Sequence, residues 1–104
     1  MNTYYEKYVK AYQATPKGKY IRQRANAQQR GIEWKLSFEE WWSIWEKSGK
    51  WAQRGRKHHE YVMGRIHDEG PYEVGNVKII TQKENSLQGY AHGLGLFKTG
   101  ELKY

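Results

Sequence analysis

Aromatic side chains supply most of the large apolar groups in this chain and constrain its fold more than any other feature. The 104 residues include five Trp, nine Tyr and two Phe, which give 16 rings. Leu, Ile, Val and Phe number only 17, below the roughly 20% at which a chain is expected to be disordered. Because each buried ring removes about 150–250 Å² from water, we expect one small domain, residues 1–104, with an aromatic core.

Composition also limits the chemistry that the chain can perform. It contains no Cys, which excludes disulfides, a thiol nucleophile and Cys-ligated zinc or iron–sulfur sites and fits a reducing cytoplasm. No apolar run approaches the 18 residues of a membrane span, so we expect no membrane partner.

The first half of the chain, residues 1–50, is expected to be mainly helical. Aromatic residues at helical spacing predict a helix over about residues 3–13, namely Tyr4, Tyr5, Tyr8 and Tyr12. After a break at Thr15–Gly18, the pattern predicts a second helix over about residues 18–30. A third helix begins after Ser37, whose side chain forms a capping box with Glu40, and ends before Gly49.

Residues 58–90 follow a strand, loop, strand, helix order. Segments 61–66 and 76–80 are typical of strands, and they are separated by a stretch rich in turn residues. A capping box at Thr81 opens a helix over about residues 82–89. The hairpin, covered by this helix, is expected to draw apolar surface from Val62, Ile66, Val77 and Ile79.

The sequence therefore predicts an α+β fold in which N-terminal helices pack on a C-terminal ββα unit. Residues 91–104 contain three Gly and a few apolar residues. They are expected to form either a loose tail or a closing strand.

Positive charge is concentrated in two segments. Residues 1–31 contain seven Lys or Arg and a single acid, and residues 51–60 contain three Lys or Arg and a single acid. This balance favours a nucleic-acid partner, and it nominates as DNA-binding residues Lys17, Lys19, Arg22, Arg24, Arg30, Arg54, Arg56 and Lys57. The alternatives are a solvated helix surface and contact with an acidic protein.

The segments Gly70-Pro71-Tyr72, Gly75-Asn76-Val77 and Lys83-Glu84-Asn85 lie at fixed spacing after Arg65 and Asp68. In these residues and their spacing the chain resembles the HNH (ββα-metal) endonuclease superfamily, and more closely a set of small bacteriophage proteins within it. The resemblance covers about residues 17–90. It implies an HNH-like ββα unit, a divalent metal such as Mg²⁺ in active members, a double-stranded DNA partner and a phage protein acting in the host cytoplasm.

The resemblance also assigns site residues. In such nucleases the first strand ends with a metal-binding acid or His, followed by a catalytic His that activates water. Here those positions hold Gly64, which has no donor atom, and Arg65, which stays protonated. Asn76 matches the Asn that pins the loop, and Asn85 or Gln88 falls near the metal ligand on the helix.

A shifted site is the alternative. If the chain cleaves DNA, His67 would be the general base and Asp68 a metal ligand, with Asn85 or Gln88 from the helix, and His59, as further ligands. Arg65 would then hold the phosphate. Otherwise the ββα unit serves DNA binding or protein contact, with Asn76 and Asp68 holding the loop by hydrogen bonds to the backbone.

Two clusters have more than one interpretation. A metal could be held by His58 with Glu60, or by His59 with His67; the alternative is two exposed His in a loop that contacts phosphate. The five Trp, at positions 34, 41, 42, 45 and 51, are expected in the core; the alternative is stacking on unpaired bases.

The leading functional interpretation is an HNH-like DNA-binding protein of phage type with an altered nuclease centre. The first alternative is a non-enzymatic phage protein that binds and modulates a host protein. The second is an active HNH endonuclease or nickase with a shifted site.

Overall fold

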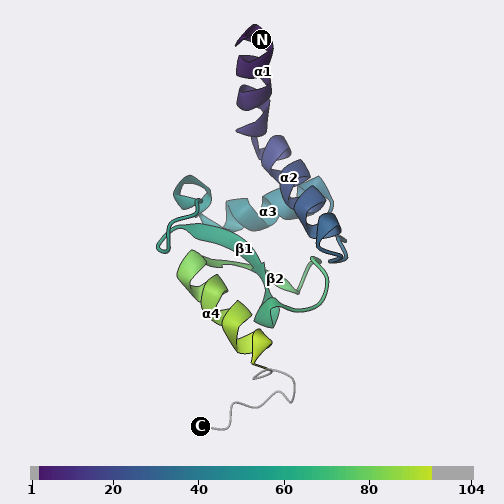
Figure 1. Ribbon diagram of the computed structural model, residues 1–104, viewed down its shortest axis with the longest axis vertical. Helices are drawn as coiled ribbons and strands as arrows, with labels where there is room; N and C mark the ends of the chain where they lie inside the picture. The colour runs from purple at the N-terminus through teal and green to yellow at the C-terminus, as the bar shows by residue number, and fades with distance from the viewer. Residues whose placement is uncertain (1–2, 95–104) are drawn as a thin grey trace.

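The computed structural model describes residues 3–94, without the side chains of Thr3, Tyr4, Tyr5 and His92. In chain order its elements are α1 (Thr3–Gln13), α2 (Pro16–Gln29), α3 (Phe38–Ser48), the 3₁₀ turn η1 (Trp51–Gln53), β1 (Tyr61–Arg65), the 3₁₀ turn η2 (Ile66–Asp68), β2 (Val77–Thr81) and α4 (Gln82–Gly93). The predicted α+β class is confirmed, with helices first and a ββα arrangement last. Figure 1 shows α3 and α4 on opposite sides of the hairpin.

The register of the hairpin decides which side chains meet which helix. β1 and β2 pair antiparallel, with Met63 opposite Ile79 and Gly64 opposite Lys78. Met63, Val77 and Ile79 pack in the aromatic cluster that includes α3. Gly64 faces the other way, against Asn85 of α4, because successive strand residues point to opposite faces.

Two helices are longer than predicted. α2 begins at Pro16 rather than residue 18, since the Thr15 hydroxyl accepts a hydrogen bond from the Gly18 N–H at 3.1 Å and Pro fits the first turn. α4 continues to Gly93, so residues 91–93 of the predicted tail are helical. Residues 95–104 of that tail lie outside the described part of the chain.

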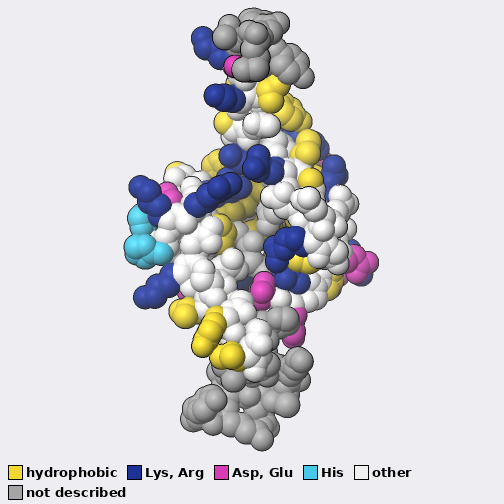
Figure 2. All heavy atoms as spheres, in the orientation of Figure 1, with side chains coloured by type: hydrophobic (Ala, Val, Ile, Leu, Met, Phe, Trp, Pro, Cys, Tyr) yellow, Lys and Arg dark blue, Asp and Glu magenta, His cyan; other side chains and the backbone are white. Residues whose placement is uncertain are grey.

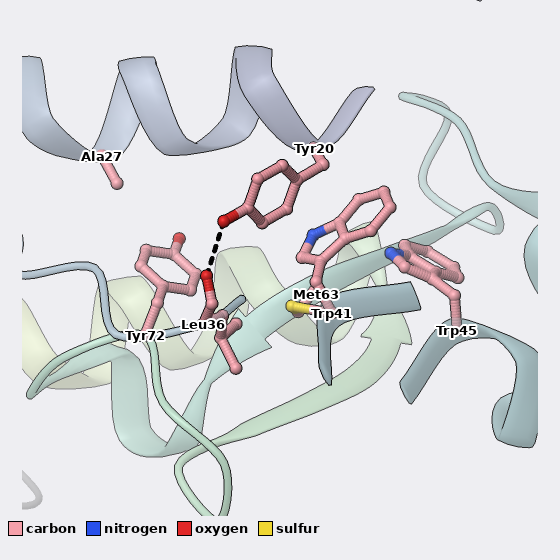
Figure 3. Close-up of a cluster of buried hydrophobic side chains, with 7 residues drawn as sticks. All are labelled: Tyr20, Ala27, Leu36, Trp41, Trp45, Met63 and Tyr72. Carbon is pink, nitrogen blue, oxygen red and sulfur yellow. Dashed lines mark hydrogen bonds between the residues drawn. The ribbon is translucent and has the colours of Figure 1, made fainter. Parts of the chain in front are cut away.

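The core is built from rings, as the composition predicts. Trp41 and Trp45 of α3 are the largest fully buried side chains. Tyr20 of α2 meets Trp41 edge to face, with ring centroids 5.7 Å apart, and donates its hydroxyl to the Leu36 carbonyl at 2.6 Å, the dashed line in Figure 3. This bond satisfies the phenol inside the core and fixes α2 relative to the chain that leads into α3.

α1 stands apart from this core. Figure 1 shows it extending away from the rest of the molecule. Its Tyr8 and Tyr12 are 68% and 49% exposed. Tyrosine spacing therefore predicted the helix correctly, although these two rings are not buried.

The loop after β1 is strained and closely held. The predicted strand over 61–66 ends one residue early, at Arg65, and Ile66 begins η2. His67 and Asp68 both have φ of 56°, a left-handed conformation that costs non-glycine residues energy. The surrounding contacts of Arg65 and Asn76 hold the chain in this shape.

Candidate nucleic-acid interface

A groove of about 490 Å³ runs along the edge of β1 that does not pair with β2. α2 forms one wall, and the segment after η1 and the start of α4 form the other. Met63 marks the edge, because its carbonyl faces α2 and accepts a hydrogen bond from Gln23 at 3.4 Å. Figure 2 shows Lys and Arg side chains gathered on the face where α2 approaches the strands.

The lining of the groove is strongly cationic. No Asp or Glu among the described residues contributes to it. Its five basic side chains are those of Lys19, Arg22, Arg30, Arg54 and Arg56. Lys35 and Arg65 form ion pairs within residues 3–94, and none of the five groove cations takes part in one. The groove cations therefore have no internal counter-charge, and a concave wall of one sign concentrates the positive potential.

Four carboxamides also line the groove, and two of them hold its walls together. Gln23 accepts from the Trp41 indole N–H at 2.8 Å while it donates to Met63. Gln82 donates to the Gly55 carbonyl at 3.3 Å. Asn26 and Asn85 make no side-chain hydrogen bond within the described residues, so their amides can bond a ligand.

The eight predicted DNA-binding residues divide into two sets. Five line the groove, and three lie elsewhere, namely Lys17, Arg24 and Lys57. Lys17 sits over the Phe38 ring at 4.6 Å from its centroid, and Arg24 sits over the Tyr20 ring at 5.3 Å. The groove residues of α2 lie at positions 19, 22, 23, 26 and 27, with Arg30 at its C-cap, which is the spacing of one helix face. That spacing was available in the sequence and separates Arg22 from Arg24.

The surroundings of Arg54 change its acidity. It is half-buried, and this burial lowers the pKa of its guanidinium because the charged form loses hydration. The guanidinium stays protonated at neutral pH, because arginine is not deprotonated in proteins.

Two of the predicted metal-binding residues, His59 and His67, lie at opposite ends of β1. The carboxamide of Asn85 lies against Gly64, at the position where the HNH resemblance places a ligand. Asp68 pairs with Arg65. His59 precedes β1 and His67 follows it, so the strand separates them by roughly 16 Å at about 3.3 Å per residue.

A divalent ion is therefore not well accommodated by these residues. Within the described chain, no group of three or more His, Asp or Glu side chains is placed to hold a metal. His58 and His59 are exposed and lie edge to face, 5.3 Å between ring centroids, and the Glu60 carboxylate instead accepts from the Lys57 backbone N–H at 2.9 Å.

Arg65 is buried and holds the loop that follows β1. It is only 8% exposed and donates to the Gly70 carbonyl at 2.7 Å and to the Asp68 carboxylate at 3.2 Å. Its guanidinium also lies over the Tyr72 ring, 5.5 Å from the centroid. These contacts occupy the group that the sequence interpretation assigned to phosphate.

Asn76 closes the same loop from its other side. Its amide donates to the carbonyls of Glu69 at 2.9 Å and Pro71 at 2.8 Å. Both bonds run from side chain to backbone, so they fix the loop conformation directly.

Comparisons of the chain with models of known protein families, with curated proteins and with solved structures gave no match. Within residues 3–94, no helix combines the length and the apolar character that crossing a membrane requires. The groove and its charges are the basis for the functional inference below.

Proposed function

We propose that this protein binds double-stranded DNA through the groove beside β1, as an HNH-like protein of phage type whose nuclease centre is altered. The observation that carries the proposal is the lining itself, in which five basic side chains and no acidic one surround a single concavity. Lys and Arg neutralise phosphates and release bound counterions, which is the main source of affinity for DNA.

The dimensions of the basic stripe suit a DNA strand. From Lys19 to Arg30, α2 advances roughly 16 Å along its axis at 1.5 Å per residue. One strand of a duplex carries a phosphate about every 3.4 Å along the helix axis. The stripe is therefore long enough to follow several successive phosphates, while Asn26 and Asn85 can bond base edges or sugars.

The proposal of an altered nuclease centre is supported by the packing at Gly64. A Cβ atom added there would lie 2.8 Å from Asn85 Oδ1 and 3.1 Å from Ile80 Cδ1. The position that would hold a ligand side chain is therefore occupied by neighbouring atoms. Mg²⁺ requires near-octahedral oxygen coordination, and the dispersed His and Asp residues do not supply it.

The salt dependence of binding tests this proposal. Fluorescence anisotropy with a labelled duplex should give a straight line of log affinity against log salt. If all five groove cations contact phosphates, the slope is about −4.5, which corresponds to roughly a 500-fold loss between 50 and 200 mM salt. A slope shallower than about −1, or no binding at 50 mM salt, would contradict the proposal.

A second candidate is a non-enzymatic protein that binds and modulates a host protein. It is favoured by an exposed apolar stripe that includes Leu87 and Tyr90 of α4 and Leu94 directly after it, which are 58%, 69% and 57% exposed. These residues share one helix face at spacings of three and seven, and such patches commonly mark protein contacts. Binding through this stripe would depend little on salt, so the same titration separates the two candidates.

A further inference from the structure

Arg54 differs from the other groove cations in how it is held. Its guanidinium carbon lies 5.7 Å from the centroid of the Trp45 ring and 5.2 Å from that of the Trp51 ring. Both distances are within the range of a cation–π contact. Because two indoles restrict the side chain, Arg54 loses little further entropy when it binds a ligand.

The backbone beneath Arg54 is also fixed. The N–H of Arg54 donates to the Trp51 carbonyl at 3.2 Å, and that of Gly55 donates to the Tyr61 carbonyl at 3.2 Å. Arg54 forms an isolated bridge with Tyr61, and Gln82 ties Gly55 to α4. The side chain therefore projects from a segment that is anchored to both β1 and α4.

The donors of Arg54 remain available despite this packing. No hydrogen bond or ion pair of its guanidinium is found within residues 3–94, although the group carries five N–H donors. The acid in the same loop, Glu60, accepts from the Lys57 backbone instead. A half-buried cation without a counter-charge is costly, and an oxyanion would remove that cost.

Arg65 offers a comparison, because its guanidinium binds groups within the protein. Arg65 also lies over an aromatic ring, but its Nη1 and Nη2 donate to Gly70 and Asp68, and only its buried Nε has no partner within residues 3–94. Arg54 has comparable aromatic support, lines the groove and has no hydrogen bond or ion pair of its guanidinium within the described residues. Both arginines pack against aromatic rings, but only the guanidinium of Arg65 forms hydrogen bonds within the described residues.

We propose that Arg54 is the anchor of the groove, and that it holds one backbone phosphate of the bound DNA through paired N–H donors. This inference rests on the proposed function. It adds that Arg54 contributes more to the affinity for DNA than each of the other four groove cations. The other four neutralise phosphates without the support of an aromatic ring from the described part of the chain. Arg54 supplies a preorganised, partly desolvated fork that matches phosphate geometry.

Matched lysine substitutions test the inference. Arg54→Lys keeps the charge but removes the fork and the flat surface that stacks on the indoles, so duplex affinity should fall about tenfold or more. Arg56→Lys, an exposed neighbour in the same groove, should change affinity by less than about threefold. Circular dichroism and thermal unfolding establish that both variants are folded.

Equal effects of the two substitutions would overturn the anchor role of Arg54 and leave DNA binding by the groove intact. Absence of duplex binding by the unsubstituted protein would instead overturn the proposed function. The two failures are therefore distinguishable in one titration series.

A measurement on the unsubstituted protein makes the test independent of folding in the variant. Saturating duplex should shift the indole N–H resonances of Trp45 and Trp51, because a phosphate bound to Arg54 changes the field at the two rings. If the complex forms and both resonances keep their positions, the phosphate is not held at Arg54.

Discussion

At the residue scale, the loop between β1 and β2 shows how far single residues could be interpreted from the sequence. The resemblance to HNH nucleases matched Asn76 to the residue that pins the loop, and its two bonds to backbone carbonyls lie in that loop. The position of Arg65 could not be derived in the same way. Its contacts depend on the burial of Tyr72 and on the left-handed turn at His67, which are properties of the folded chain.

Removing the Asn76 amide tests the role of this loop in stability. Asn76→Ala breaks two hydrogen bonds and leaves the Glu69 and Pro71 carbonyls without these donors, so the free energy of unfolding should fall by about 1–3 kcal/mol. Val74→Ala in the same loop is the control, because Val74 is 61% exposed. Urea unfolding measures both. Similar small changes in the two variants would show that the amide does not hold the loop.

At the element scale, local sequence signals located the helices and strands well, because caps and turns act within a few residues. The Ser37–Glu40 capping box and the Gly49 terminator both occur in α3 as expected. The start of α2 was missed because Thr15 and Pro16 were interpreted only as a break, whereas they cap and begin the helix. The close approach of Gly64 to Asn85 was not predictable, since it depends on how α4 crosses the hairpin.

The contact between Gly64 and Asn85 leads to a prediction about packing. Gly64→Ala should lower the free energy of unfolding by about 1–3 kcal/mol, because the new methyl group meets Asn85 Oδ1 and Ile80. Adding Asn85→Ala removes one of these two conflicts and should recover part of the loss. The recovery is measured as a double-mutant cycle in urea unfolding. Strictly additive effects would mean that the two residues do not compete for the same space.

At the scale of the whole molecule, the aromatic composition explains both the core and the groove. Trp41, Trp45 and Trp51 pack α3 and η1 together, and the same rings support Arg54 and, through Gln23, connect α2 to β1. The sequence predicted a basic N-terminal third, but it did not show that residues 54–56 complete the wall opposite α2. That arrangement needs contacts between segments about 30 residues apart in the chain.

The central claim is that location in the groove, rather than net positive charge, produces DNA binding. Arg22 and Arg24 lie on the same helix, but only Arg22 lines the groove, while Arg24 sits over the Tyr20 ring. Arg22→Glu and Arg24→Glu change the net charge of +7 by the same amount.

The affinity of each variant for a labelled duplex at about 100 mM salt is the most direct test. Arg22→Glu should weaken binding by roughly 10- to 100-fold, because it loses a phosphate contact and adds repulsion, and Arg24→Glu should weaken it by less than about threefold. Equal losses in the two variants would contradict the account, since binding would then follow the charge of the molecule and not the groove.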